Sequence, residues 1–174
     1  GTPRWGGAWK KAAAHWYNRT FSLNIHGACQ SYRDCYLDLD PTYKDANGLP
    51  LLRMTFDWRD MEHKASAFIT ARMEEIGKRI GAQHVHAEPR TGRYTIVPYQ
   101  STHNTGGTIM GTSPGNSVVN KFCQSWDCHN LFVMGASLFP HNSAYNPTGP
   151  VGALAYWAAD AIKNRYLKNP GALV

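Results

Sequence analysis

A stretch of alternating apolar and polar residues is the feature that most constrains the fold. Every second residue from 52 to 58 is apolar, which is the pattern of a strand with one buried face. The Asn-Gly pair at 47–48 is typical of a tight turn, and an apolar segment at 36–39 precedes it. Strands joined by so short a connection run antiparallel. The pattern therefore predicts an antiparallel sheet, with another turn at the Asp-Pro pair 40–41.

Helices and shorter strands are expected around this sheet. Apolar residues recur at helical spacing from Met61 to Ile80, so we expect an amphipathic helix that lies on the sheet. Asp57 or Asp60 would cap the start of this helix, and Gly81 would end it. The sequence also predicts a short helix at 10–17 and short strands at 21–26 and 84–86.

The chain changes character near residue 100. Glycine, asparagine, serine, threonine and proline become frequent and charged residues become rare, as in loops that form a binding site. A short apolar strand is expected at 130–135. Apolar residues from Val151 to Ile162 predict a final helix that begins near Thr148 or Gly149. Its first backbone N–H groups would suit an anionic or electron-rich group.

Composition limits the classes of function. The chain has 174 residues, a net charge of +6 and 17% charged residues. Its cations are scattered singly or in pairs, so we expect no nucleic acid partner. It contains no apolar run as long as a membrane span. The four cysteines permit two disulfides but lack the spacing of a zinc or iron–sulfur ribbon, and the His-Val-His run at 84–86 lacks a third ligand, so no metal site is expected.

Four motifs in a consistent order resemble the C-terminal region of the glucose–methanol–choline (GMC) oxidoreductases. They are THNTGGTIMGTSP at 102–114, SVVN at 117–120, WDCHNLFVMGASLFP at 126–140 and YNPTGPVGALAYWAADAI at 145–162. The opening GTPRWG and the segment at 32–58 resemble more specifically the large flavoprotein subunit of bacterial membrane-bound gluconate 2-dehydrogenase and of sorbitol, fructose and glucose dehydrogenases. The resemblance covers nearly the whole chain.

The resemblance implies an enzyme that contains flavin adenine dinucleotide (FAD) and oxidises an alcohol group of a sugar, polyol or aldonic acid. In that family a histidine and a second histidine or asparagine line the substrate side of the flavin, and His103 and Asn146 match them here. His103 would accept the hydroxyl proton, because imidazole exchanges protons near neutral pH. Asn146 would orient the hydroxyl by hydrogen bonding, because an amide does not titrate.

The resemblance also implies contacts with the cofactor. Many relatives have an acidic residue where Gly135 stands, so a contact there would come from the backbone. His141 lies five residues before Asn146 and is a rival for the role of base; we expect it instead on the substrate side. The candidates for cofactor binding are Gly135, Ala136, Asn146, Pro147 and Thr148.

The Gly-x-Gly-x-x-Gly turn of a dinucleotide-binding fold does not occur in this sequence. We therefore expect a fragment without the N-terminal Rossmann-like part of the enzyme, inactive by itself. Residues 1–100 would be part of the substrate domain and residues 101–174 the C-terminal part of the FAD-binding domain, in an α+β fold. The alternative is a non-catalytic binding or structural fragment that keeps the sheet but cannot bind FAD alone.

Partners and location are expected from the resemblance alone. It implies a sugar or sugar-acid substrate, together with a small subunit and a cytochrome c subunit in the complete complex. It also implies a position on the periplasmic side of the bacterial inner membrane, held there by the partner subunits.

Overall fold

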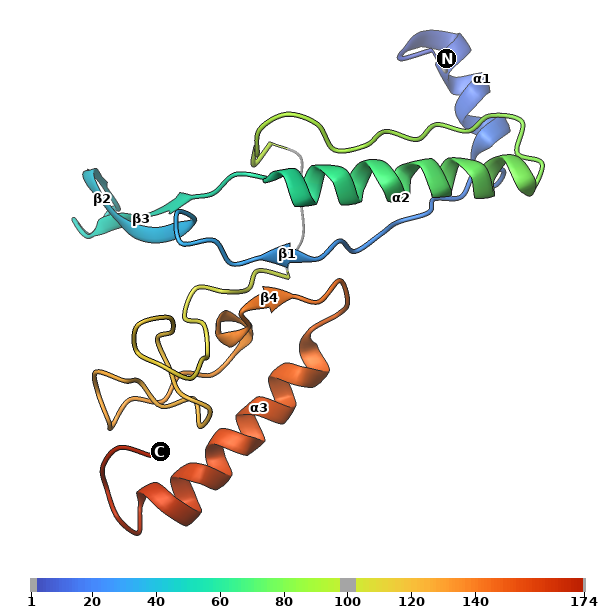
Figure 1. Cartoon of the computed structure of the whole chain (residues 1–174). Helices are drawn as coiled ribbons and strands as arrows, with labels where there is room; N and C mark the ends of the chain where they lie inside the picture. The colour runs from blue at the N-terminus through green and yellow to red at the C-terminus, as the bar shows by residue number, and fades with distance from the viewer. Residues whose placement is uncertain (1–2, 98–102, 174) are drawn as a thin grey trace.

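A computed structural model describes residues 3–97 and 103–173 of the chain. Both of its two-stranded sheets, β1–β4 and β2–β3, are antiparallel, which confirms the α+β class. In Figure 1, α1, α2 and the β2–β3 hairpin lie in one part, and the segment from residue 103 onward forms the other. The elements, in chain order, are α1 (Gly6–Trp16), β1 (Cys29–Gln30), β2 (Tyr36–Lys44), β3 (Pro50–Thr55), α2 (Asp60–Arg79), the 3-10 helix η1 (Ala136–Leu138), β4 (His141–Asn142), α3 (Thr148–Ala161) and the π-helix η2 (Ile162–Tyr166).

The β2–β3 hairpin follows the predicted alternation. Leu37 pairs with Met54 and Leu39 pairs with Leu52, so these four side chains share one face of the ribbon. Each of them is more than half exposed. The sequence predicts that α2 lies on the sheet, but the structure differs, because α2 continues away from the hairpin after β3 (Figure 1). The apolar face of the hairpin is therefore not covered by α2.

The two predicted turns have different outcomes. At 47–48 the chain does turn: Gly48 has a φ of +82°, and its N–H donates to the carbonyl of Asp45 at 3.1 Å. At 40–41 the prediction is wrong, because β2 runs through both residues with a shift in its register. Asp40 Oδ1 accepts hydrogen bonds from the backbone N–H groups of Thr42 and Tyr43. The Asp-Pro pair thus makes an irregularity within a strand instead of ending it.

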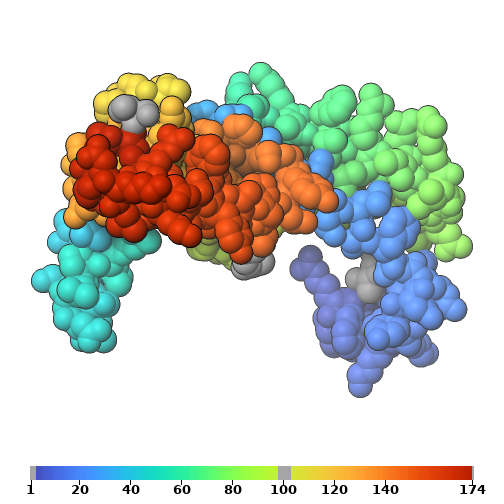
Figure 2. Space-filling view, turned by 90° about the horizontal axis from the view of Figure 1, so that it is seen from below, coloured from blue at the N-terminus to red at the C-terminus, as the bar shows by residue number. Residues whose placement is uncertain are grey.

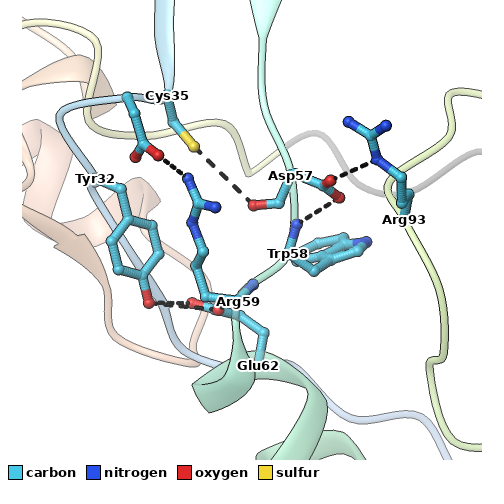
Figure 3. Close-up of polar contacts among 8 residues, drawn as sticks. Tyr32, Cys35, Asp57, Trp58, Arg59, Glu62 and Arg93 are labelled. Atoms are coloured by element: carbon cyan, nitrogen blue, oxygen red, sulfur yellow. Dashed lines mark hydrogen bonds and ion pairs between the residues drawn. The ribbon is translucent and has the colours of Figure 1, made fainter.

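Helix α2 spans nearly the predicted residues and is followed by Gly81, whose φ is +77°. The prediction that Asp57 or Asp60 caps it is wrong. Arg59 occupies the N-cap position, and its N–H donates to the carboxylate of Glu62 at 3.0 Å. Glu62 is buried and also accepts a hydrogen bond from the Tyr32 hydroxyl at 3.1 Å (Figure 3). The start of α2 is thereby tied to the segment that follows β1.

Asp57 ties the end of β3 to residues 93–94. Its carboxylate accepts hydrogen bonds from the N–H of Tyr94 at 2.8 Å, from Arg93 Nε at 2.9 Å and from the N–H of Trp58 at 2.9 Å. Figure 3 shows the Arg93 and Trp58 bonds. The backbone bond from Tyr94, followed by the bond from Arg93, lowers the pKa of Asp57 to about 2.

Three predicted strands are not strands in the structure. Residues 21–26 and 84–86 belong to no strand, and within ranges 3–97 and 103–173 no segment pairs with them. At 130–135 only one antiparallel bridge forms, between Phe132 and Gln124. Two backbone hydrogen bonds flank this bridge. The N–H of Ser125 donates to the carbonyl of Leu131, and the N–H of Val133 donates to the carbonyl of Cys123. Alternation alone predicted extended backbone but not a partner. The helix predicted at 10–17 is α1, which begins earlier.

The core lies in the C-terminal part of the chain. Gln124 is buried there, donates to the carbonyl of Gly171 at 2.8 Å and accepts from the N–H of Leu173 at 2.7 Å. These bonds hold the last described residues against the core. The helix predicted at 151–162 is α3, with Pro150 in its first turn. The buried apolar cluster is Val119, Cys123, Leu138 and Ala158.

The molecule is open. Its solvent-accessible surface is 13191 Å², whereas a compact protein of 19.4 kDa exposes about 8,500 Å². Figure 2 shows the β2–β3 hairpin, in cyan, and the N-terminal segment with α1, in blue, projecting from the rest. Among the helices described, none combines the length and the apolar character that a membrane crossing requires.

Candidate functional site

His103 lies in a half-buried position where two elements meet. Its backbone carbonyl accepts a hydrogen bond from Asn142 Nδ2 of β4 at 3.1 Å. Its ring contacts the ring of His26, with centroids 5.1 Å apart and planes inclined by 61°. His26 lies three residues before β1, which pairs with β4. The β1–β4 ribbon therefore holds His103 by both its backbone and its side chain.

The Gly-Gly pair after His103 allows the loop to approach this ribbon closely. Gly106 has a φ of +87°, and a Cβ placed on it would lie 2.1 Å from Ser31 Oγ and 3.2 Å from Ser31 Cβ. A side chain does not fit there, and glycine adopts this φ readily. After the pair, the N–H of Thr108 donates to the carbonyl of Ser137 at 2.9 Å. The loop is thus fixed between the β1 segment and η1.

Asn142 links the His103 loop to the segment that carries Asn146. Its Oδ1 accepts a hydrogen bond from the N–H of Ala144 at 3.1 Å, while its Nδ2 holds His103. Ala144 has a φ of +61°, a conformation that non-glycine residues adopt rarely. Two residues later, Asn146 is exposed and directly precedes Pro147, the N-cap of α3. The Asn142 side chain therefore connects the His103 loop to the segment that leads into Asn146.

The rival base, His141, lies on the other side of the ribbon. It is exposed and pairs with Gln30 in the β1–β4 ladder. Successive residues of a strand point to opposite faces. Because Asn142 reaches His103, the neighbouring His141 side chain is directed away from it.

The segments predicted to contact the cofactor have uncrowded backbone with unbonded N–H groups. Gly135 has a φ of +116°, and a Cβ placed on it would meet nothing within 4 Å. The N–H groups of Gly135 and Ala136 donate to no group of the described residues. Pro147 is the N-cap of α3 and has no N–H, so the free N–H groups of that helix begin with Thr148 and Gly149. Both segments fit a ligand that accepts hydrogen bonds from backbone.

The cysteines and the histidine pair 84–86 form no metal centre in the part of the chain that is described. No group of three or more histidine, cysteine, aspartate or glutamate side chains gathers there. All four cysteines are free thiols. Burial, followed by the nearby Glu62 carboxylate, raises the pKa of Cys29 to about 11. His84 contacts the ring of Trp16, and His86 lies 3.6 Å from a carboxylate oxygen of Glu88.

Sequence reasoning missed Asn142 and Ser31, and it placed His26 only within a strand expected at 21–26. Each gains its place at the site from the β1–β4 pairing. One local signal existed for Asn142: an asparagine often accepts a hydrogen bond from the backbone two residues later. The long-range contacts had no signal, because nothing in the sequence pairs residues 29–30 with residues 141–142.

Comparison with known proteins decides the family. A family model described as GMC oxidoreductase matches residues 31–155, which is more than half of the chain. The chain belongs to the GMC oxidoreductases. The matched part of this GMC oxidoreductase contains the loop after His103, the hydrogen bond from Asn142 to the His103 carbonyl, and Asn146.

Three relatives show how the similarity is distributed. The gluconate 2-dehydrogenase flavoprotein of Pantoea cypripedii is 50% identical over 176 residues, covering 100% of this chain and 29% of that protein. The fructose dehydrogenase large subunit of Gluconobacter japonicus is 35% identical over 74% of this chain and 22% of that subunit. The 2-methyl-1,2-propanediol dehydrogenase of Mycolicibacterium austroafricanum is 31% identical, covering 91% of this chain and 28% of that protein. This GMC oxidoreductase chain thus spans less than a third of the length of each.

Proposed function

We propose that the chain forms part of an FAD-dependent dehydrogenase that oxidises an alcohol group of a sugar, polyol or aldonic acid. The observation that carries the proposal is the position of His103, held by the β1–β4 ribbon beside the segment that bears Asn146. The family match and the dehydrogenase relatives support the reaction class. The 50% identity to a gluconate 2-dehydrogenase flavoprotein favours an aldonic acid substrate.

His103 and Asn146 have separate roles in this proposal. An imidazole nitrogen of His103 takes the proton of the substrate hydroxyl as the carbinol carbon is oxidised. The side-chain amide of Asn146 orients that hydroxyl, since an amide both donates and accepts hydrogen bonds. Asn146 is exposed and makes no hydrogen bond through its side chain within the described ranges, so its amide is available to a substrate. His141 serves at most on the substrate side.

The cofactor would be held by backbone from two segments. When bound, FAD accepts the hydride from the carbinol carbon. The open N–H groups at Gly135 and Ala136 suit an acceptor such as a diphosphate or ribityl oxygen. The N-terminus of α3 suits the electron-rich edge of the flavin ring, with Thr148 as its first N–H donor and Pro147, which has no N–H, contributing only contact. The main cofactor motif would lie outside this sequence.

Residues 1–100 and 101–174 would then belong to different domains of a larger flavoprotein. The exposed apolar face of β2–β3 and the large total surface support burial against further protein. A small subunit and a cytochrome c subunit would complete the complex, in keeping with the "large subunit" in the name of the fructose dehydrogenase relative. Such a complex would act on the periplasmic side of the bacterial inner membrane. The fragment alone would be inactive.

The test is reduction of the flavin under anaerobic conditions in the full-length protein. Gluconate, fructose, sorbitol and 2-methyl-1,2-propanediol should each be mixed with the oxidised enzyme while its absorbance is followed. We expect an oxidised flavin spectrum that bleaches with at least one of them, and fastest with gluconate. A full-length protein with no flavin spectrum, or with a flavin that none of them bleaches, would contradict the proposed function.

A further inference from the structure

The Asn142 side chain donates one hydrogen bond and accepts another. Its Nδ2 donates to the His103 carbonyl at 3.1 Å, and its Oδ1 accepts from the N–H of Ala144 at 3.1 Å. We propose that Asn142 is a positioning residue, which fixes His103 relative to the Asn146 segment. This inference rests on the proposed function, because it gives Asn142 a role only through the residues that act on the substrate.

The backbone of Asn142 is itself fixed. Asn142 lies opposite Cys29 in the β1–β4 ladder, and its side chain is half-buried. The segment around Cys29 touches the same loop at two further points, through the ring of His26 on His103 and through Ser31 at Gly106. The bond from Asn142 is therefore one of several contacts between this ribbon and the His103 loop, and its direction is set by the ribbon.

The amide of Asn142 supplies a separate atom for each of the two bonds. Nδ2 is a donor and Oδ1 is an acceptor. The acceptor supports Ala144 in its rare φ of +61°, and this turn sets where the chain leads into Asn146. The donor fixes the backbone at His103. Loss of the donor would remove this hold on the His103 backbone, and loss of the acceptor would loosen the turn before Asn146.

The consequence for the reaction is geometric. Proton transfer from the hydroxyl requires His103 at hydrogen-bond distance while Asn146 orients the same hydroxyl. A small displacement of one relative to the other lowers the rate of the chemical step but leaves substrate binding largely in place. A residue with a merely structural role would lower stability or cofactor content instead.

The experiment compares variants of the full-length flavoprotein, with gluconate as the probe substrate. Asn142→Ala removes both bonds, whereas Asn142→Asp keeps an acceptor for Ala144 and loses the donor to His103. Asn130→Ala, at an exposed site, is the matched control. We expect both Asn142 variants to lower the limiting rate of flavin reduction about tenfold, within the range that a misplaced catalytic group causes. The gluconate dissociation constant and the FAD content should stay near those of the control.

A second readout does not depend on activity. Hydrogen exchange at residues 143–146, measured by mass spectrometry without substrate, should accelerate in Asn142→Ala and stay near the control in Asn142→Asp. Combining Asn142→Ala with His103→Ala should add nothing to the loss of rate that His103→Ala causes alone. If Asn142→Ala fails to fold, Asn142→Asp decides the same question.

The outcomes distinguish failure of the positioning role of Asn142 from failure of the proposed role of His103. If His103→Ala is slow while Asn142→Ala and Asn142→Asp reduce their flavin as fast as the control, the inference is overturned and the proposed function stands. An additive loss in the double variant also overturns it, because Asn142 would then act independently of His103. If His103→Ala itself reduces at the control rate, the proposed role of His103 fails, and the inference fails with it.

Discussion

Gly106→Ala is the substitution with the most direct structural consequence in the His103 loop. The new Cβ would lie 2.1 Å from Ser31 Oγ and 3.2 Å from Ser31 Cβ, and φ at Gly106 is +87°. The left-handed backbone costs alanine about 1–2 kcal/mol. Crowding against Ser31 adds about 1–3 kcal/mol, toward the low end because Oγ can rotate away. We therefore expect the free energy of unfolding to fall by about 3 kcal/mol.

Urea-induced unfolding, followed by tryptophan fluorescence, measures this loss. Gly107→Ala is the matched control, since its Cβ would meet only ordinary contacts, the nearest at 3.9 Å. Ser31→Ala removes Oγ, so in the double variant the cost of Gly106→Ala should fall toward the backbone part alone. A cost of less than about 0.5 kcal/mol, typical of a surface substitution, would refute the packing described for this loop. So would an equal cost at Gly107.

Three further predictions concern other parts of the chain. Gln124→Leu removes the hydrogen bonds that hold residues 171–173, so we expect the free energy of unfolding to fall by about 2 kcal/mol and proteolysis of the C-terminus to become faster. Unchanged proteolysis would show that these bonds do not hold the C-terminal residues. The lowered pKa of Asp57 gives stability above pH 4 that disappears as pH falls toward 2. Asp57→Asn should therefore flatten the pH dependence of unfolding in that window. Cys29, with a pKa raised to about 11, should react with iodoacetamide at pH 8 more slowly than the exposed Cys128; equal rates would contradict its burial.

The elements that could be predicted from sequence are those specified by local patterns. The 52–58 alternation with Asn-Gly at 47–48 predicted the hairpin, and helical spacing predicted α2 and α3. The failures are of two kinds. Residues 21–26 have the alternation but no partner strand among the described residues. Asp40-Pro41 is a turn signal, but β2 continues through it. The backbone N–H groups of the next residues donate to the Asp40 carboxylate instead.

The site was predictable only as a resemblance. Motif matching singled out His103 and Asn146 but gave no physical connection between them. The connection depends on β1 pairing with β4, which are more than a hundred residues apart and two residues long each. Such short strands carry no periodicity, so Asn142, His26 and Ser31 could not be placed beside the loop from sequence. The domain boundary between residues 100 and 101 falls at residues outside the described ranges and stays a prediction.

Flavin reduction in a His103 variant shows whether His103 removes the substrate proton. The full-length His103→Ala variant should be mixed anaerobically with gluconate, and the absorbance of its flavin followed by stopped flow. We expect FAD to stay bound and to be reduced normally by dithionite, while reduction by gluconate slows by a factor of about 10² or more, as for the loss of a general base. Reduction by gluconate at the wild-type rate, with FAD bound, would contradict the account.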